Sequence, residues 1–566
     1  MRSRKRRIIR ATGGVIAGML AVSACSTTVG GSGTAATTTG GSNHVILTVV
    51  GNTGGPQPRS FNPYLPTSGI NALWGAAGMI YEPLAQLDDV KPTISYPWLA
   101  QSWAWSNDNK TLTFHLRKGV KWTDGKPFTS ADVVFTFNML KKFPQLNTGG
   151  VTFQSISAPD PLTAVMTFSA PSFTQFFYIA ENTYIVPEHI WAHVKDPATY
   201  ENPKPVGTGP YELNSFQPSA MLLTRNPHYW QPGLPKVYGL RYVQYSENST
   251  AIEAQENGQV DWGGGPIPDG QKLYVDKAPQ FYHFWYPATG IVSILPNETV
   301  WPLNMPAVRK AISLAVNRQQ IDTVGESGYE APVTSATGLL LPGDASELDS
   351  AYQNANLVQN VSAAKNLLTQ AGFKMDSKGL MALGGKEIKL TLGDPSGFAD
   401  YMTDAQVIAT ELKKVGIAIT VQGLSTNGWF SDIADGSFQM TLMWSNSATG
   451  DGYAVLDSLL DYTLSGPIGK SFSGGDYERW NDPQTQALLS QYKNSPTPAG
   501  RQQALSGLEG IMVNQVPVIP LVGAADWSSY STRKVTGFPS PSNPYDAATS
   551  GTPAGEVVVL HLVPRS

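Results

Sequence analysis

Hydrophobic and polar residues follow two different periods along this chain, and these periods predict a mixture of strands and helices. Alternation at every second position in residues 103–117 and 151–168 predicts two pairs of antiparallel strands. The sequences NDNK and TDGK have the composition of tight turns between or after such runs. Further strands are expected in residues 44–50, 220–245 and 516–522.

Spacings of three and four residues between apolar positions predict amphipathic helices elsewhere. The segments with this spacing are residues 70–82, 186–194, 249–258, 305–321, 361–372, 399–416, 482–494 and 499–516. Strand-like runs at 387–393 and 417–424 enclose one of these helices, so βαβ units are expected from about 385 to 445. The chain is thus predicted to be mixed α/β, with two βα-rich regions that flank a strand-rich insertion.

The run TFHLRKGVKWTDGKPFTSADVVFTF combines charge, aromatic rings and turn residues more densely than any other. Its pattern predicts a strand, a tight turn and a helix whose N-cap is Thr129 or Ser130. His115, Asp124 and Asp132 lie close together in this sequence. A strand position, a turn and a first helical turn account for them, so the run is interpreted as structural.

Composition narrows the class of protein. With 566 residues, of which 41% are hydrophobic and 14% charged, the chain is expected to form several cores under a lightly charged surface. The net charge of −4 provides no basic face for nucleic acid, which excludes that class of partner. Fourteen Trp and 23 Tyr supply flat rings that suit peptide or sugar surfaces, although most should pack in cores.

The first residues have the pattern of an export signal. Basic residues between Arg2 and Arg10 precede an apolar stretch, so residues 1–24 are interpreted as a signal peptide. Cys25 is the only cysteine and directly follows Val-Ser-Ala, which resembles a bacterial lipobox and predicts lipidation. Residues 25–42 are rich in Gly, Ser and Thr and are expected to form a flexible tether. The protein is therefore expected outside the cytoplasm, attached by lipid to the cell membrane, after export by the Sec or the twin-arginine route.

Nine motifs follow one another across residues 45–530: IYEPLAQLD, PWLAQSW, LTFHLRKGVKWTDGKPFTSADVVFTF, VPEHIW, PVGTGPYEL, NPHYW, GQVDW, MPAVRKAISLAVNRQQI and DYERWNDPQTQALL. In this order they resemble the extracytoplasmic solute-binding proteins of ABC importers, in the dipeptide, oligopeptide and nickel-binding class. The resemblance implies a two-lobed periplasmic-binding-protein type II fold with an extra β-rich inserted domain (cluster C). It also implies a monomer without cofactor that captures a ligand by hinge closure and docks on the transmembrane subunits of a permease.

The resemblance further implies how the chain is divided. The first lobe would be assembled from residues 43–79, 206–290 and 525–566, and the second lobe from residues 291–524. The β-rich domain would be inserted at residues 80–205.

In this family an Asp three residues after a Trp of the second lobe pairs with the α-amino group of a bound peptide, because a buried ammonium needs a countercharge. Trp444 matches that Trp, but Ser447 stands where the Asp is expected. Asp451 would substitute if the loop is repositioned, and a turn role in TGDG is an equal alternative. Asn446, Ser447 and Thr449 would also suit sugar hydroxyls. An oligopeptide ligand is therefore predicted, with a cello- or manno-type oligosaccharide as the alternative.

Five more residues are candidates for ligand contact. Trp262, Trp285 and Tyr286 are placed by the resemblance where ligands of the family pass. Trp429 would begin a second-lobe segment close to the cleft, and Asn62 would line the first lobe. Packing is an equal alternative for each aromatic residue, and an Asn-Pro turn accounts equally well for Asn62.

Metal binding and catalysis find little support. His189 and His193 have i,i+4 spacing but lack a third ligand, so a surface helix is preferred and no metal is expected. The chain has no Gly-x-Ser-x-Gly, His-Glu-x-x-His or phosphate-loop motif. Carboxylate pairs that could hydrolyse glycosides occur in any large protein, so a secreted glycan-acting enzyme stays the alternative from another class. The protein is predicted to be a binding protein and not an enzyme.

Overall fold

The structure, a computed structural model, describes residues 44–565 apart from short stretches at residues 54, 66–72, 74–75, 92–93, 266, 447–451, 471–473, 496 and 552. These residues belong to one unit, His44–Ser566. The predicted signal peptide and the tether with Cys25 lie outside the described residues, as do Ser447, Thr449 and Asp451. What the sequence predicts for them stays a prediction.

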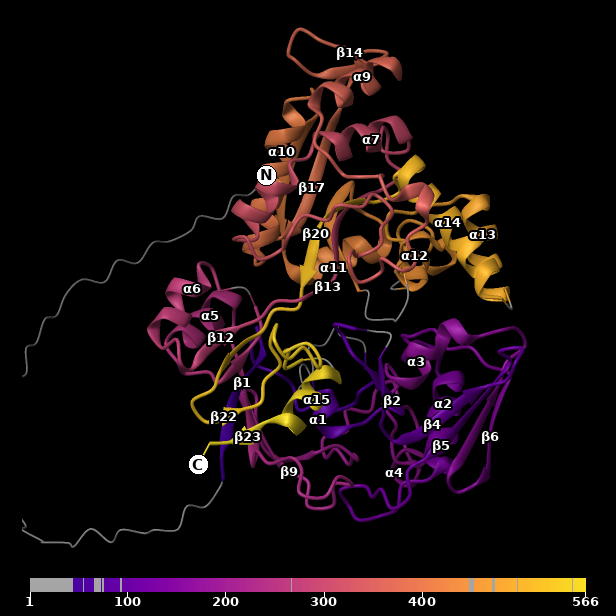
Figure 1. The fold of residues 1–566 in the computed structure, drawn as a ribbon, viewed down its shortest axis with the longest axis vertical. Coiled ribbons are helices and arrows are strands. Elements are labelled where there is room, and N and C mark those ends of the chain that lie inside the picture. Colours follow the sequence, from indigo (N-terminus) through magenta and orange to yellow (C-terminus); the bar gives the residue numbers. More distant parts are fainter. Residues whose placement is uncertain are drawn as a thin grey trace, which may run out of the picture. The chain divides into compact units, whose positions relative to one another are not determined.

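Segments that lie far apart in the sequence form a seven-stranded mixed sheet in the described chain (Figure 1). Its strand order is β12-β21-β11-β1-β10-β9-β8. The strands are β1 (Ile46–Asn52), β8 (Tyr211–Gln217), β9 (Ala220–Arg225), β10 (Gly239–Gln244), β11 (Trp262–Gly263), β12 (Tyr282–Phe284) and β21 (Ser529–Ser531). β1 runs parallel to β10 and β11, and its residues Leu47 and Val49 are fully buried. The strand predicted at 44–50 is confirmed.

Four helices belong to the chain segments around this sheet. They are α1 (Ala77–Ile80), α5 (Asn248–Glu256), α6 (Gly270–Leu273) and α15 (Pro553–His561). α15 packs against α1 and against the short strand β2 (Ala85–Leu87), so the C-terminal part of the chain contacts segments from its first hundred residues.

An antiparallel four-stranded sheet with the order β4-β5-β7-β6 is built from one continuous part of the chain. Its strands are β4 (Ala100–Trp105), β5 (Thr111–Leu116), β6 (Ser155–Asp160) and β7 (Thr163–Thr167). Helix α2 (Ser130–Lys142) packs on β6 and β7 and starts after Thr129, whose side chain accepts a hydrogen bond from the Ala131 amide. Asp132 accepts a hydrogen bond from the Thr129 amide at 2.9 Å and completes a capping box. The predicted hairpins and the capped helix are confirmed.

A five-stranded sheet with the order β18-β17-β19-β13-β20 forms the centre of a third region. Its strands are β13 (Ala288–Pro296), β17 (Lys389–Pro395), β18 (Ala418–Leu424), β19 (Met440–Asn446) and β20 (Ile519–Ala525). The helices of this region are α7 (Pro306–Ala315), α9 (Val361–Gln370), α10 (Ala399–Lys413), α11 (Thr426–Asp435), α12 (Gly452–Leu460), α13 (Pro483–Asn494) and α14 (Pro498–Gln515). β17 and β18 are parallel and α10 connects them, which confirms the predicted βαβ unit.

Smaller elements complete the described chain. The short strands are β3 (Ser95–Pro97), β14 (Lys374–Met375), β15 (Met381–Leu383), β16 (Lys386–Glu387), β22 (Val535–Thr536) and β23 (Val563–Pro564). The short helical segments are α3 (Phe176–Ala180), α4 (Glu188–Trp191), α8 (Arg318–Gln320), the π-helical η4 (Ile321–Gly325) and the 3₁₀ turns η1 (Pro144–Leu146), η2 (Phe173–Gln175), η3 (Val275–Lys277), η5 (Ser350–Tyr352) and η6 (Tyr462–Leu464). None of the described helices combines the length and the apolar character needed to cross a bilayer.

In the described residues, three helices are shorter than their hydrophobic patterns predict. In the segment predicted at 70–82, the described helix is only α1. Tyr81 after it is extended, and its hydroxyl donates to the Phe61 carbonyl oxygen at 2.8 Å. In the segment predicted at 305–321, Val316 is extended and the Asn317 side chain caps α8 instead. The predicted helix at 186–194 is reduced to the four residues of α4.

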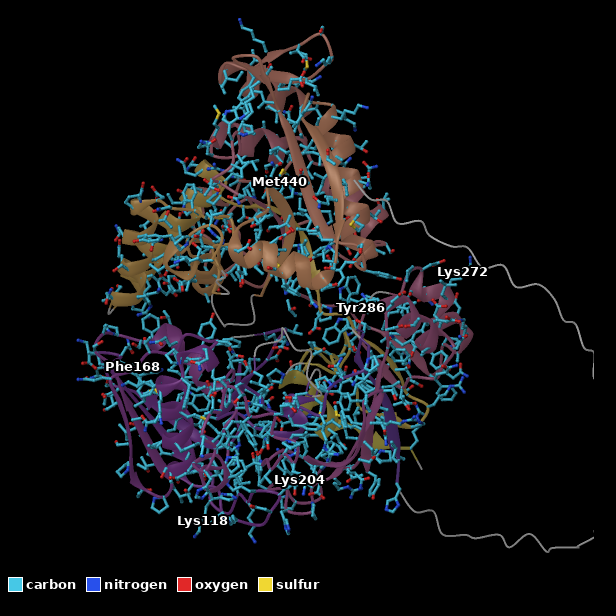
Figure 2. All side chains as sticks on the ribbon, turned by 180° about the vertical axis from the view of Figure 1, so that it is seen from behind. Lys118, Phe168, Lys204, Lys272, Tyr286 and Met440 are labelled. Carbon is cyan, nitrogen blue, oxygen red and sulfur yellow. The ribbon has the colours of Figure 1, made fainter. Side chains whose placement is uncertain are left out.

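Two short segments connect the seven-stranded sheet with the five-stranded sheet. Residues 285–287 lead from β12 to β13, and residues 526–528 lead from β20 to β21. Their backbones are hydrogen-bonded to each other, because the Trp285 amide donates to Ser528 and the Asp526 amide donates to Pro287. Figure 2 shows Tyr286 in the first segment. The pocket described below lies at this connection.

Candidate functional site

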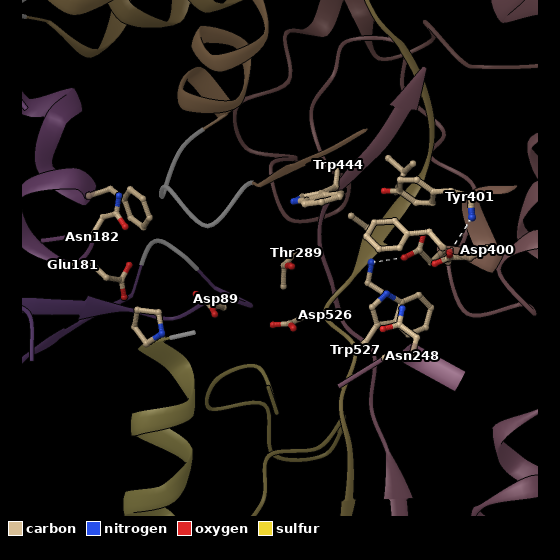
Figure 3. A pocket seen from close by; sticks show the side chains of 18 residues that line it. Asp89, Glu181, Asn182, Asn248, Thr289, Asp400, Tyr401, Trp444, Asp526 and Trp527 are labelled. Atoms are coloured by element: carbon tan, nitrogen blue, oxygen red, sulfur yellow. Dashed lines mark hydrogen bonds between the residues drawn. The ribbon is translucent and has the colours of Figure 1, made fainter. Parts of the chain in front are cut away.

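A pocket of about 500 Å³ is formed where the connecting segments meet the two sheets, a size that suits a small peptide or sugar (Figure 3). The residues that line it are Asp89, Phe177, Glu181, Asn182, Asn248, Gly265, Thr289, Val292, Glu330, Phe398, Asp400, Tyr401, Trp444, Ala524, Ala525, Asp526, Trp527 and Pro553. The fold therefore brings residues from most of the chain into one site.

Strand ends position the centre of the pocket. Val292 on β13 lies opposite Trp444 on β19 in the sheet register, and both residues line the pocket. Ala525 is the last residue of β20, and Asp526 and Trp527 follow directly as the chain leaves the sheet. Asp526 and Trp527 are thus presented by a hydrogen-bonded segment instead of a free loop.

Aromatic rings form the apolar part of the pocket. The Trp444 ring lies 5.9 Å from the Trp429 ring and 6.4 Å from the Tyr401 ring, measured between centroids. Across the connecting segments, the Trp527 ring packs edge-on against Tyr286 at 4.7 Å. Trp444, Tyr401 and Trp527 are all visible around the pocket in Figure 3. Rings held in this way are suited to stack on flat ligand groups.

Five carboxyl groups also line the pocket, and they are Asp89, Glu181, Glu330, Asp400 and Asp526. Burial raises the pKa of Asp526 to about 8, and the charge of Asp89 adds to this effect. Burial likewise raises the pKa of Glu181, of Glu330 and of Asp400. No Lys, Arg or His occurs among the described lining residues, and the sequence has none in the internal stretches that the structure leaves out. The described lining of the pocket is therefore acidic.

The carboxyl group of Glu330 is held by a hydrogen bond from the backbone. Its residue is only 4% exposed, and its Oε1 atom accepts a hydrogen bond from the Ala525 amide at 2.7 Å. Its Oε2 atom is buried and has no hydrogen-bond partner in the described structure. One oxygen of this carboxyl group is therefore held by the backbone, and the other has no partner in the described structure.

A second pair of carboxyl groups lies next to Glu330 and Asp400. Glu326 and Asp404 are almost fully buried, and none of their carboxyl oxygens has a hydrogen-bond partner in the described structure. Burial and the charge of Glu326 raise the pKa of Asp404. A Cβ atom at Gly325, the last residue of η4, would overlap the Asp404 carboxyl group, so glycine permits the close approach.

Among the aromatic residues predicted to contact ligand, only Trp444 lines the pocket. Trp429 is 1% exposed behind it, and its Nε1 atom donates to Thr441 Oγ1 at 2.7 Å. Trp262 is fully buried in the core of the seven-stranded sheet, and its Nε1 atom donates to the Ala548 carbonyl oxygen at 2.7 Å. Both indoles pack in cores and have their N–H groups satisfied, so the structure places neither of them in the pocket.

The other predicted residues take supporting or peripheral positions. Asn62 is fully buried and its side-chain amide donates to the carbonyl oxygens of Pro197 and Tyr200, which makes it a bracing residue. Trp285 packs against the core of the seven-stranded sheet, and Tyr286 supports the pocket residue Trp527. Asn446 ends β19 opposite Gly290; nothing is described for its side chain. Ser447 and Asp451 lie outside the described residues.

None of the five carboxyl residues of the pocket was predicted from the sequence. Asp526 and Trp527 follow the strand predicted at 516–522, and a carboxylate beside an indole at a strand end is a signal that sequence reasoning could have used. Glu330 and Asp400 carry no comparable signal, because they are 70 positions apart and meet only through the packing of η4 on α10.

In the part of the chain that the structure describes, no group of three or more His, Cys, Asp or Glu side chains has the arrangement of a metal site. His189, one of the two histidines considered as metal ligands, contacts Asp124 instead, with 2.7 Å between Nε2 and Oδ2.

Two sheets, the segments that connect them and a pocket at the connection are typical of proteins that bind a small solute. Residues 95–466 match the family model of bacterial extracellular solute-binding proteins, family 5. This chain belongs to that family.

Individual relatives agree with the family assignment. Protein XP55 of Streptomyces lividans is 28% identical over 383 residues, which are 62% of this chain; the chain spans 65% of the length of XP55. The glutathione-binding protein GsiB of Escherichia coli (strain K12) is 26% identical over 456 residues, covering 78% of this chain and 82% of GsiB. A mannohexaose-bound crystal structure of a periplasmic oligopeptide-binding protein from Thermotoga maritima is 26% identical, has a TM-score of 0.81, and covers 92% of this chain and 99% of its own. The predicted type II fold with a β-rich inserted domain is confirmed.

Proposed function

We propose that this protein is the solute-binding component of an ABC importer and that it binds an oligopeptide in the acidic, aromatic pocket. The observation that carries the proposal is the pocket itself, in which Trp444 and Trp527 accompany carboxyl groups without any described basic residue. Such groups suit the flat amide planes and the ammonium of a short peptide. GsiB, a relative over most of the chain, is a glutathione-binding protein, and glutathione is a tripeptide.

The connecting segments would allow the two sheet-bearing lobes to close on the ligand. Each segment is only three residues long, and hydrogen bonds between them keep them side by side. Short paired segments of this kind can act as a hinge while the sheets move as rigid bodies. Closure would bury the solute between the rings and exclude water, and the closed form would then deliver it to the transmembrane subunits of a permease.

The proposal includes the cellular setting that the N-terminal sequence predicts. Residues 1–24 would direct export, lipid on Cys25 would hold the protein at the cell membrane, and residues 25–42 would tether it there. The lobes would have the limits given above, with the β-rich domain inserted at residues 80–205. Labelling with a radioactive fatty acid tests the anchor: a Cys25→Ser variant should lose both the label and membrane attachment.

An oligosaccharide is the second candidate ligand, because a structural relative over nearly the whole chain binds mannohexaose. Trp444 and Trp527 could stack on sugar rings, and Asn182 and Asn248 in the lining could bond hydroxyl groups. The acidic lining without a base favours the peptide, since a neutral sugar would leave the carboxylates uncompensated.

Thermal shift and calorimetry with tripeptides, mannohexaose and cellohexaose distinguish the two ligand classes. Peptides are expected to raise the melting temperature and the sugars to leave it unchanged. Trp444→Ala should weaken peptide binding by about tenfold or more, because the ring platform is lost. Trp105→Ala, which removes a ring from the four-stranded sheet, is the matched control and should leave the affinity unchanged. Stabilisation by a sugar alone would overturn the peptide assignment.

Asp451 stays a proposed anchor for the α-amino group. Asp451→Asn should then weaken binding of a free peptide but not of its N-acetylated form. If the native protein and Asp451→Asn bind the free peptide with equal affinity, Asp451 is not part of the site. The same preparations should not hydrolyse peptides or glycans; turnover by pure protein would favour the glycan-acting enzyme.

A further inference from the structure

We propose that the pocket selects solutes that carry a basic group in addition to any amino terminus, and that Glu330 together with Asp400 receives that group. This inference rests on the proposed function, since it assumes that the pocket is where the solute binds. The solute would carry a positive charge, and Glu330 and Asp400 at one end of the pocket would bind it.

The geometry of Glu330 is the first reason. Its Oε1 atom is fixed by the Ala525 amide, so the carboxyl plane is held without help from a ligand. Its Oε2 atom is buried in the wall of the pocket without a hydrogen-bond partner in the described structure. Leaving a buried carboxyl oxygen unpaired costs free energy, and a donor from the solute would recover it. Neutral donors would serve as well as basic ones if Glu330 stood alone.

The surroundings of Glu330 favour a basic donor. Asp400 lines the pocket beside it, and one of its Oδ atoms accepts a hydrogen bond from the Tyr401 amide at 2.9 Å (Figure 3). The ionisable groups that face this end of the pocket from η4, α10 and the adjoining strand are Asp322, Glu326, Tyr329, Asp394, Tyr401 and Asp404. All of them are carboxyl or phenol groups. The negative potential of Asp400 and of the pair behind it therefore adds to that of Glu330.

Within the part of the chain that the structure describes, no ion pair neutralises this end of the pocket. None of the ion pairs in the described chain includes Glu330, Asp400, Glu326 or Asp404. The internal stretches without a description contain no Lys, Arg or His in their sequence, so they cannot supply the missing charge. A guanidinium or ammonium group of the solute is the species that would satisfy both Glu330 and Asp400, because it offers several donors and a positive charge at once.

Rings beside the carboxyl groups would hold the rest of a basic side chain. Tyr401, Phe398 and Trp444 line the same part of the pocket, and the Phe398 and Tyr401 rings pack edge-on at 5.9 Å. Apolar walls around an ionic contact suit the methylene chain of Arg or Lys, which packs on rings while its head reaches the carboxylates. An acidic side chain would meet like charge at this place.

Matched peptides test the inference on the full protein. Tri-alanine with Arg at the first, second or third position is compared with the same peptides containing citrulline, which has nearly the shape of Arg but no charge. At least one Arg peptide is expected to bind about tenfold or more tightly than its citrulline partner. In Glu330→Gln this preference should fall to about threefold or less, because the amide keeps the shape and loses the charge.

Glu509→Gln is the control variant. Glu509 is likewise fully buried and accepts a hydrogen bond from a backbone amide, that of Asp349, but it lies on α14 outside the pocket lining. It should bind every peptide as the native protein does. An equal loss of preference in both variants would show that the effect is not specific to Glu330 and would overturn the inference.

The remaining outcomes separate this inference from the proposed function. If Arg and citrulline peptides bind equally, the protein is a peptide receptor and the inference is wrong. If no peptide binds but a glucosamine tetramer binds more tightly than its N-acetylated form, the basic group is carried by a sugar; the charge assignment then stands and the peptide assignment fails. If the two sugars bind equally, or nothing binds, the inference fails.

Discussion

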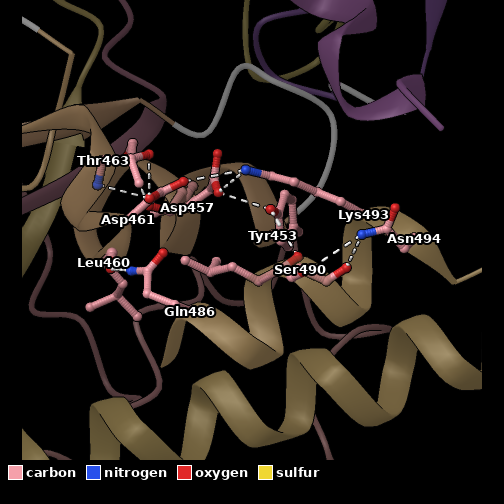
Figure 4. Close-up of polar contacts among 12 residues, drawn as sticks. Tyr453, Asp457, Leu460, Asp461, Thr463, Gln486, Ser490, Lys493 and Asn494 are labelled. Atoms are coloured by element: carbon pink, nitrogen blue, oxygen red, sulfur yellow. Dashed lines mark hydrogen bonds and ion pairs between the residues drawn. The ribbon is translucent and has the colours of Figure 1, made fainter. Parts of the chain in front are cut away.

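Asp457 and Asp461 form an acidic pair that has its own base (Figure 4). Lys493 Nζ lies 3.0 Å from Asp457 Oδ1 and 3.3 Å from Asp461 Oδ2. The Tyr453 hydroxyl donates to Asp457 at 2.8 Å, and the Thr463 amide donates to Asp461 at 3.0 Å. One lysine from α13 thus compensates two carboxylates at the end of α12, and both carboxylates also accept hydrogen bonds.

Glu330, Asp400, Glu326 and Asp404 belong to the same half of the molecule, but none of the ion pairs in the described residues includes them. Glu330, Glu326 and Asp404 are more deeply buried than Asp457. Burial and neighbouring negative charge raise the pKa of each of these three carboxyl groups instead. The charges of Asp457 and Asp461 are compensated by a lysine of the protein itself. Glu330, Glu326 and Asp404 are compensated only by a proton or by a cation from outside the fold.

Removing Lys493 from its contacts with Asp457 and Asp461 should have the largest effect on the free energy of unfolding. In Lys493→Met, Asp457 and Asp461 would repel each other without compensation. The expected loss is about 2 kcal/mol in the free energy of unfolding, less than for a fully buried pair because the Lys493 side chain is 35% exposed. Guanidinium unfolding followed by circular dichroism measures it. Unchanged stability would mean that Lys493 does not stabilise Asp457 and Asp461. The two groups of carboxylates would then not differ in charge compensation.

Local features of the fold could be predicted from the sequence, because neighbouring residues decide them. The Thr129 cap, the hairpins β4-β5 and β6-β7 and the unit β17-α10-β18 all follow from patterns within about forty residues. The helix at 305–321 was predicted too long, since the Asn317 cap that interrupts it competes with an otherwise unbroken apolar pattern.

The site was predictable only in part, because its members come from separate elements. Trp444 was found through its family motif and does line the pocket. Trp262 and Trp429 were equally plausible as ligand platforms, but aromatic side chains look alike in sequence whether they face a pocket or a core. Glu330 and Asp400 could not be paired beforehand, since no pattern in the sequence reports which carboxylates lack a base after folding.

The buried carboxyl groups at the pocket should make the protein less stable as the pH rises. Burial raises the pKa of Asp526 from 3.8 to about 8, and burial and neighbouring charge raise those of Glu330 and Asp404. The native protein therefore keeps protons that the unfolded chain has lost, a contribution that is complete below about pH 4 and declines as the pH approaches 8. The free energy of unfolding is expected to fall by about 1.5 kcal/mol or more between about pH 5 and about pH 8.

Asp404→Asn assigns part of that decline to the pocket group. The amide can donate to Glu326 at any pH, so the decline should become shallower by about 1 kcal/mol over the same interval. Glu509→Gln, in which a buried carboxyl group of α14 is lost, serves for comparison. An unchanged slope in Asp404→Asn would show that titration of Asp404 does not contribute to the decline.

The same chemical change should have opposite signs in the two groups. At about pH 8, Glu330→Gln removes an uncompensated charge while the side-chain oxygen can still accept from the Ala525 amide, so stability should rise by about 0.5–1 kcal/mol. Asp461→Asn removes one of the two charges that Lys493 compensates, so stability should fall by about 1 kcal/mol. Chemical denaturation of both variants without ligand provides the measurement. A loss of stability in both would indicate that Glu330 is already compensated in the free protein.

The smallest effect is expected at the surface pair of His189 and Asp124. The two side chains are 22% and 30% exposed and lie on α4 and on the turn before α2. Because water screens such a pair and Asp124 also accepts a hydrogen bond from the Lys126 amide, Asp124→Asn should change the free energy of unfolding by less than about 0.5 kcal/mol. Peptide affinity should stay the same, since neither residue lines the pocket. A loss of more than about 1 kcal/mol would show that partial exposure does not weaken a carboxylate–base contact in this protein. Burial would then not explain why the charges at the pocket cost more free energy than those at the surface.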